Sequence, residues 1–343
     1  MIVVGASVRA IAMSAWRAGS RPWCVDRFAD RDLQSLAPTR LLPAADYPHG
    51  LPALLADAPK DEPIRWTGGL ENHPDVLERL AQLRPMLGIS PAIVRACRQP
   101  WCVAQWLQES DYPALEVSRE PPTSGRYLSK PLASAGGIGI QFANGVPHPH
   151  HYYQRYIEGI SLAAIYRGAQ LCGITRQLHE GFHYAGSVGP WPVSPSVEAE
   201  LQRLGSILFA HGLDELYGVD LILAEGVPYV VEINPRYTAS VEILEWSRGQ
   251  SLLGDTHGPA QGIIGKRILY ARKPGQFPDA GPWDAMPNFA PWQVPAYADI
   301  PAAGTRFDTG EPIMTVYATG ASGAAVLEQL QRIEATTIRF WDG

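Results

Sequence analysis

GVDLILAEGVPYVVEINPR, residues 218–236, is the stretch that decides the fold of this 343-residue chain. Two runs rich in β-forming residues, 217–223 and 228–233, flank the turn residues AEGV at 224–227. Runs of this length around a glycine-containing turn predict a β-hairpin. We therefore expect two antiparallel strands here, with side chains that alternate between the two faces of a sheet.

Polar side chains of this hairpin should gather on one face. Asp220 on the first strand and Glu232 and Asn234 on the second share one phase of the alternation, and Arg236 follows in the same phase. Carboxylate and amide oxygens suit Mg²⁺, and a guanidinium binds phosphate or carboxylate. A solvated hairpin with polar side chains facing water would give the same alternation, so the pattern alone leaves both interpretations open.

An earlier stretch combines a lysine with a glycine-rich turn. Residues 127–131 predict a strand that contains Lys130, and the sequence SAGGIG follows at 134–139. Glycine lets backbone N–H groups approach an anion closely, and lysine supplies a mobile positive charge. The stretch predicts a phosphate-binding loop, with a plain surface loop as the alternative. Its candidate residues are Lys130, Ser134, Gly136, Gly137 and Gly139.

In this order along the chain, the two motifs resemble those of the ATP-grasp superfamily, and the matches cover residues 95–240. The resemblance implies that Asp220, Glu232 and Asn234 hold Mg²⁺, or Mn²⁺ in its place, between the phosphates of ATP. It also implies that Lys130 contacts the α and β phosphates and that the loop 134–139 folds over the phosphate tail.

A third segment resembles the hinge at which this superfamily cradles adenine with backbone groups. Two positions depart from the family pattern: Gln154 stands where many relatives carry glutamate, and Pro100 stands where relatives often place another phosphate-binding lysine. Arg95 and Arg98 are the nearby cations that would compensate for that lysine. The implied adenine-binding residues are Gln154, Arg155, Tyr156 and Ile157.

The resemblance implies an ATP-dependent carboxylate–amine ligase. In such enzymes a carboxylate takes the γ-phosphoryl group of ATP to form an acyl phosphate, and an amine then displaces phosphate to give an amide. The implied catalytic cations are Lys130, Arg176 and Arg236. The expected partners are a small-molecule carboxylate and an amine, and family habit implies a homodimer.

Within the superfamily, the likeness extends to archaeal-type ligases of one-carbon cofactor biosynthesis, such as tyramine–glutamate ligase. The tail residues 299–301 and 310–316 contribute to this resemblance, which implies glutamate or another amino acid as a substrate. Two alternatives stay open. One is an ATP-dependent carboxylase that activates bicarbonate, and the other is a non-catalytic nucleotide-binding protein.

The chain should be an α/β protein with more than one packed unit. A strand at 2–4, a turn and helix, and a second strand at 23–25 ending at Asp26 predict a Rossmann-like start. Ser7 and Arg9 either contact a substrate or simply begin the helix. We expect a Rossmann-like domain at 1–90, an ATP-grasp domain at 91–255 with its lid at 95–155, and a C-terminal segment at 256–343 that completes the large lobe.

Composition argues against several other classes. Hydrophobic residues make up 46% of the chain and charged residues 18%, as in ordinary globular proteins. A net charge of −6 lacks the basic surface that nucleic-acid binding needs. No apolar stretch reaches the roughly 20 residues that span a bilayer, and the start lacks the pattern of a secretory signal. We expect a cytoplasmic location, with neither nucleic acid nor membrane as a partner.

Histidines form two groups to which we assign no metal. HEGFH at 179–183 spells the string of zinc proteases, but Gly181 lies inside it and no helix is predicted there. We expect a polar loop near the cleft instead. His148, His150 and His151 crowd a proline-containing turn, where exposed loop histidines are the common case.

Overall fold

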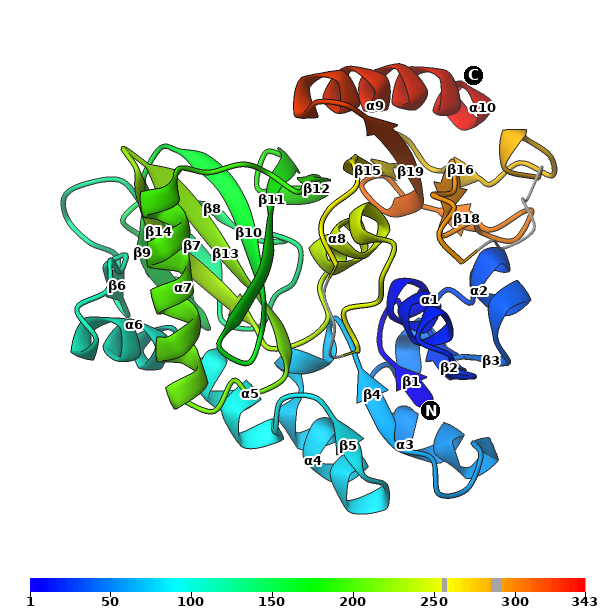
Figure 1. The fold of residues 1–343 in the computed structure, drawn as a ribbon. Helices are drawn as coiled ribbons and strands as arrows, with labels where there is room; N and C mark the ends of the chain where they lie inside the picture. The colour runs from blue at the N-terminus through cyan, green and yellow to red at the C-terminus, as the bar shows by residue number, and fades with distance from the viewer. Residues whose placement is uncertain (255–257, 285–290, 343) are drawn as a thin grey trace.

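The computed structural model describes residues 1–254, 258–284 and 291–342 of the chain, and Figure 1 shows their arrangement. The described strands form sheets of eight, five, four and two strands. The two-stranded ribbon pairs β16 (Gly275–Gln276) with β18 (Arg306–Phe307). The predicted boundary at 255–256 lies outside the described residues.

The N-terminal residues form a parallel sheet in the order β3-β2-β1-β4-β5, as the predicted strand–helix–strand start implies. The carboxylate of Asp26 accepts hydrogen bonds from the backbone N–H groups of Val8, Phe28 and Ala29, each at 2.7 Å. This acid therefore holds the turn after β2 and the start of α1. The elements are β1 (Ile2–Val4), α1 (Arg9–Arg17), β2 (Trp23–Asp26), α2 (Arg31–Leu36), β3 (Thr39–Leu41), α3 (Leu51–Leu54), β4 (Ile64–Trp66), α4 (Pro74–Leu83) and β5 (Met86–Leu87).

The eight-stranded sheet is antiparallel, in the order β14-β13-β10-β11-β12-β15-β19-β17. Its edge is the predicted hairpin, which consists of β13 (Leu216–Ala224) and β14 (Val227–Asn234). The remaining strands are β10 (Ile160–Arg167), β11 (Gln170–Glu180), β12 (His183–Gly189), β15 (Ile263–Tyr270), β17 (Tyr297–Ala298) and β19 (Pro312–Gly320).

Helices cover both faces of this sheet (Figure 1). Tyr166 of β10 donates its hydroxyl hydrogen to the Leu201 carbonyl in α7 (Pro195–Ala210), at 3.0 Å. The preceding residue, Ile165, packs instead in a cluster with Val241 of α8 (Ala239–Arg248). Because strand side chains alternate, α7 and α8 lie on opposite faces. At the far end of the sheet, Lys266 of β15 points toward Glu242 of α8, so the neighbouring Gly265 faces the other way. Gly265 lies against α9 (Gly323–Thr337), and α9 therefore covers the same face as α7.

A four-stranded sheet in the order β6-β9-β7-β8 lies within the predicted lid range, and we call this sheet the lid. Its strands are β6 (Val117–Ser118), β7 (Tyr127–Pro131), β8 (Gln141–Phe142) and β9 (His151–Arg155). Strand β9 ends at Arg155, and the next residues connect it to β10. The predicted lid range 95–155 also takes in helical residues outside this sheet, which belong to α5 (Pro91–Cys97) and α6 (Pro100–Glu109).

The structure corrects the expectation of a polar loop at 179–183. Strand β11 continues to Glu180, and β12 begins at His183, so these residues form a tight β-hairpin whose turn holds Gly181 at φ +61°. Pairing between β11 and β12, which continues to Glu180 opposite His183, extends both strands beyond the local pattern. No helix is present there to place two imidazoles on one face, as a zinc protease requires.

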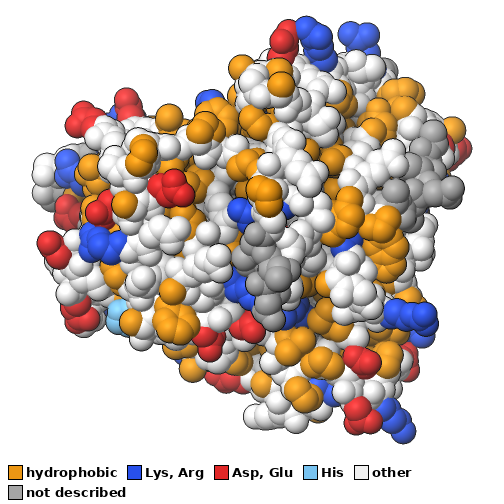
Figure 2. Space-filling model, in the orientation of Figure 1, with side chains coloured by type: hydrophobic (Ala, Val, Ile, Leu, Met, Phe, Trp, Pro, Cys, Tyr) orange, Lys and Arg blue, Asp and Glu red, His pale blue; other side chains and the backbone are white. Residues whose placement is uncertain are grey.

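The described surface mixes charges of both signs. On the face drawn in Figure 2, acidic and basic side chains are interspersed among neutral and apolar ones. Among the described residues, no helix is both long enough and apolar enough to cross a membrane.

A buried ionic network joins α1 to α8 and to the C-terminal strands. The Arg9 guanidinium pairs with Glu242 of α8, donates to Asp299 at 2.8 Å and donates to the Tyr317 hydroxyl at 3.1 Å. Burial would raise the pKa of Glu242, but the charges of Arg9 and Lys266 outweigh it and hold that pKa well below its usual value. The Arg9 guanidinium is therefore part of a buried ion-pair network, a role that differs from both expectations for this residue, a substrate contact and a simple helix start.

Removing the Arg9 charge should destabilise the protein strongly. Arg9→Met keeps the apolar stem but removes one of the two cations that pair with Glu242 among the described residues, Arg9 and Lys266. Breaking a buried pair costs about 3–5 kcal/mol. Arg332→Met is the control, since Arg332 pairs with Glu328 on exposed α9, where a pair contributes about 0–1 kcal/mol. Urea unfolding measures both variants. Equal losses in the free energy of unfolding would show that the buried network stabilises the protein no more than an exposed ion pair does.

Candidate functional site

The β13–β14 hairpin brings the predicted metal ligands together. Asp220 lies directly opposite Glu232 in the register, and Asn234 lies opposite Gly218. Asn234 donates its amide N–H to one Asp220 oxygen at 2.9 Å, and Gln177 of β11 donates to the other at 2.7 Å. The three oxygen-bearing side chains therefore share one face, which is the face covered by α8.

The electrostatics of this set suit a hard cation. Burial and then the neighbouring charge of Glu232 raise the pKa of Asp220 to about 6. Among the described residues, no group of three or more His, Cys, Asp and Glu side chains is placed to hold a metal ion. The candidate set here consists of two carboxylates and an amide. Mg²⁺ usually takes one or two carboxylates and completes its shell with phosphate and water. The donor set fits that ion.

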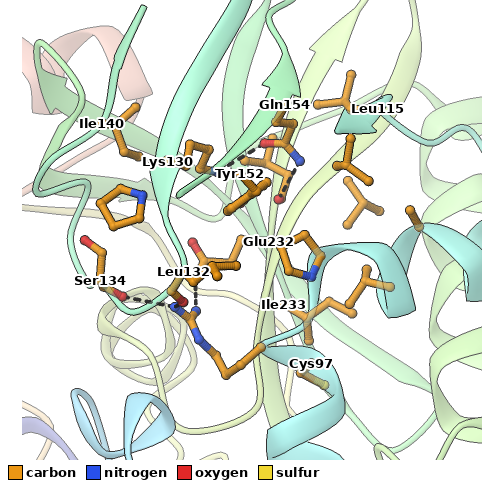
Figure 3. A pocket seen from close by; sticks show the side chains of 18 of the residues that line it. Cys97, Leu115, Lys130, Leu132, Ser134, Ile140, Tyr152, Gln154, Glu232 and Ile233 are labelled. Carbon is orange, nitrogen blue, oxygen red and sulfur yellow. Dashed lines mark hydrogen bonds and ion pairs between the residues drawn. The ribbon is translucent and has the colours of Figure 1, made fainter. Parts of the chain in front are cut away.

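Lys130 reaches the same region from the lid. It is 5% exposed, and its Nζ donates to Gln154 Oε1 at 3.1 Å, while Gln154 Nε2 donates to the Val231 carbonyl at 3.1 Å. Burial would lower the pKa of Lys130, but Tyr152, Glu232 and Asp220 outweigh it and raise the pKa. Figure 3 shows Lys130, Gln154 and Glu232 around one pocket. The lysine is thus a fixed cation beside the carboxylates.

The glycine-rich loop touches the large sheet across the cavity. The Gly136 carbonyl accepts a hydrogen bond from the Tyr184 N–H at 3.1 Å. Gly137 has φ +82°, and a Cβ there would lie 1.9 Å from the Phe182 carbonyl oxygen. The loop therefore packs backbone to backbone against the β11–β12 turn. Ser134 donates to the Ile138 carbonyl at 2.6 Å and lines only the smaller pocket, and Gly139 lines neither pocket described below.

Arg98 stands at the site, whereas Arg95 does not. The Arg98 guanidinium pairs with Glu232 and donates to the Leu132 and Ser134 carbonyls at 3.0 and 3.3 Å. Arg95 pairs with Glu78 at the surface, at 2.6 Å. Of the two candidate cations, Arg98 is therefore the one placed at the site, where it joins a predicted metal ligand to the loop beside Lys130.

Arg236 joins the hairpin to the N-terminal sheet. Its Nη2 donates to Glu71 Oε1 at 2.6 Å and to Asn234 Oδ1 at 3.2 Å, and its Nε also donates to Glu71, at 2.9 Å. Sequence reasoning missed Glu71, which lies in the turn after β4. Its position beyond the carboxyl end of a parallel strand, where open α/β sheets place ligands, was the available signal.

Arg176 does not reach the carboxylates. Gln177 faces Asp220, so the alternation of β11 turns Arg176 to the opposite face of the sheet. There the Arg176 guanidinium carbon lies 5.1 Å from the ring centroid of Trp191. The predicted role of Arg176 in phosphoryl transfer therefore lacks support from this geometry, and the neighbouring Gln177 is the residue that contacts the site.

The site residues surround a cavity of about 460 Å³. Arg155, Tyr156 and Ile157 line it beside Gln154, and the Tyr156 N–H donates to the Arg126 carbonyl at 2.8 Å, which fixes the connection to β10. His179 also lines the cavity, and burial lowers its pKa. A smaller pocket of about 60 Å³, drawn in Figure 3, adjoins it behind Lys130.

The contact of Gly137 gives a test of the closed loop. Gly137→Ala would place a methyl group against the Phe182 carbonyl and so separate the loop from the turn. Gly136→Ala is the matched control, because it has φ +63° but no atom within 4 Å of the added Cβ. Hydrogen exchange at the Tyr184 N–H should accelerate at least tenfold in Gly137→Ala and much less in Gly136→Ala. Equal acceleration would show that only the strained backbone matters.

Comparisons with known proteins agree with this geometry. Residues 97–240 match a protein-family model described as an ATP-grasp domain. The chain is 28% identical over 173 residues to an uncharacterised protein of Methanocaldococcus jannaschii, a match that spans 48% of this chain and 41% of that protein.

Two solved structures show how far the fold extends. The L-amino acid ligase of Bacillus licheniformis has a TM-score of 0.70 at 14% identity, covering 97% of this chain and 96% of that one. The biotin carboxylase domain of the Hydrogenobacter thermophilus 2-oxoglutarate carboxylase, solved with MgADP and bicarbonate, has a TM-score of 0.70 at 11% identity, covering 97% and 89%. The chain therefore has the ATP-grasp fold, and its residues 97–240 match the ATP-grasp family model.

Proposed function

We propose that the protein is an ATP-dependent carboxylate–amine ligase that forms an amide through an acyl phosphate. The observation that carries the proposal is the convergence of two carboxylates and an amide with two cations at one cavity, and with a third cation, Arg98, in the adjoining pocket. Asp220, Glu232 and Asn234 face Lys130, Arg98 and Arg236, which come from the lid, from the segment between α5 and α6 and from the end of β14. A cavity of about 460 Å³ falls within the range of small-molecule sites.

The proposed reaction has two steps. An oxygen of the substrate carboxylate attacks the γ-phosphorus of ATP, and the bond from that phosphorus to the bridging oxygen breaks, which gives an acyl phosphate and ADP. The amine nitrogen then attacks the acyl carbon, the C–O bond to the phosphoryl group breaks, and phosphate leaves with the proton of the nitrogen. Both steps need positioning and charge stabilisation more than covalent help from the protein.

Each site residue has a part in this proposal. Asp220, Glu232 and Asn234 would hold Mg²⁺, which supplies positive charge to the phosphoryl oxygens. Lys130 and Arg236 supply fixed positive charge beside them, where burial makes electrostatic interactions stronger. The glycine-rich loop, held against the β11–β12 turn, limits the access of water that would hydrolyse the acyl phosphate. Gln154 and residues 155–157, which line the cavity, would bind the adenine ring.

Nucleotide binding gives the first test. A ligand that binds only the folded state stabilises it by about 2.7 kcal/mol at a hundredfold excess over Kd. We expect MgATP to raise the thermal midpoint of the wild type, and Asp220→Asn to lose the part of that shift that needs Mg²⁺. Asp308→Asn, an exposed acid elsewhere, serves as the control and should keep the full shift. A wild type without any response to MgATP would contradict the proposal.

Turnover gives the second test. ADP formation is followed with pairs drawn from the common amino acids, with tyramine plus glutamate included because the tail resembles tyramine–glutamate ligase. We expect ADP to require both an acid and an amine, and Glu232→Gln to lower turnover at least a hundredfold by removing one metal-binding charge. The surface variant Glu78→Gln should retain activity. Bicarbonate-stimulated ADP release without any amine would instead identify a carboxylase, and normal ligation by Glu232→Gln would overturn the assigned metal site.

A further inference from the structure

One oxygen of Glu71 is left without a partner in a buried place. Glu71 is 1% exposed, and its Oε1 accepts both hydrogen bonds from Arg236. Its Oε2 is buried and has no hydrogen-bond partner among the described residues. An unsatisfied buried acceptor costs about 1–3 kcal/mol, so native proteins rarely keep one without a reason.

This carboxylate is charged, and its side chain lines the cavity of the site. Burial would raise the pKa of Glu71, but the charge and hydrogen bonds of Arg236 outweigh it and lower the pKa. Glu71 shares the cavity wall with Asp220, Glu232, Asn234 and Arg236. The hydroxyl of Tyr47, a neighbouring side chain, donates to the Gly68 carbonyl at 3.5 Å and leaves Oε2 unsatisfied. A charged carboxylate with one unpaired oxygen therefore lies at the wall of the cavity.

The hydrogen-bonding groups of the reactants indicate which of them Oε2 of Glu71 would bind. A carboxylate oxygen accepts hydrogen bonds and repels other anions. The phosphoryl group and the substrate carboxylate, both anionic, present only acceptors at the reacting atoms. The amine alone brings N–H donors there, and a hydrogen bond between a charged carboxylate and such a donor is among the strong ones.

We propose that Oε2 of Glu71 binds the amine substrate and orients its nitrogen toward the acyl carbon. Glu71 is then the residue of the N-terminal unit that recognises the nucleophile, while Oε1 keeps Arg236 in place. Because its pKa is lowered, the Glu71 carboxylate stays ionised and acts as a hydrogen-bond acceptor, not as a general base. It binds the amine, and the proton of the nitrogen leaves with phosphate. This inference rests on the proposed ligase function.

The test separates amine binding from the formation of the acyl phosphate. The acid and amine are those found in the ADP screen. Acyl-phosphate formation is measured without amine, by positional isotope exchange in ATP labelled at the β–γ bridging oxygen. For Glu71→Gln we expect the KM for the amine to rise at least tenfold while the exchange rate stays within twofold of the wild type. Glu78→Gln, whose glutamate pairs with Arg95 at the surface, is the matched control and should change neither quantity.

Other outcomes contradict the inference in distinguishable ways. If Glu71 served only to hold Arg236, Glu71→Gln would slow the isotope exchange and leave the KM for the amine unchanged, which would overturn the amine-binding role. Should Glu71→Gln fail to fold, Glu71→Asp carries the same comparison, because it keeps the charge and withdraws it by one methylene. A wild type that forms no ADP with any acid and amine would remove the proposed function, and this inference with it.

Discussion

Two carboxylates held side by side on a half-buried hairpin are the constraint on which the rest of the site depends. Asp220 and Glu232 face each other across β13 and β14, and burial with mutual repulsion raises the pKa of Asp220 to about 6. Charges of one sign in such a place need cations or hydrogen-bond donors around them. The lid provides Lys130, the α5–α6 segment provides Arg98, and β11 provides Gln177. The convergence of these distant segments follows from that need.

The same reasoning explains how the N-terminal sheet is held to the site. Arg236 extends the hairpin, and its charge is balanced by Glu71 from the turn after β4. Arg9 of α1 and Glu242 of α8 make a second buried joint, to which Lys266 and Tyr317 of the eight-stranded sheet also belong. Buried ion pairs are costly to form and costlier to break, so they favour one relative placement of the packed units. The cavity wall that contains Glu71 depends on that placement.

Local pattern was enough to predict the hairpin, the lysine strand and the glycine-rich loop. Each depends on alternation or turn chemistry within a few residues. The register of the site does not follow from alternation alone, because Asp220 lies opposite Glu232 only through the irregularity between Asp220 and Leu221. Arg176 shows the limit. Whether it or Gln177 faces the site depends on how β11 pairs with β10, and that pairing contains an irregularity at Ile165 and Tyr166. Long-range register of this kind leaves no trace in the local sequence.

The roles of Glu71 and Arg98 could not be predicted from local sequence either, because each depends on an ion pair with a residue far along the chain. Glu71 meets Arg236 and Arg98 meets Glu232 only after three sheets have assembled. Arg98 also shows how the site would respond to a metal. A divalent ion on Glu232 would replace the guanidinium as its counter-charge, while Arg98 would keep its bonds to the Leu132 and Ser134 carbonyls beside the glycine-rich loop. The freed positive charge would then lie where the loop covers the phosphates, which is where the proposed reaction needs it.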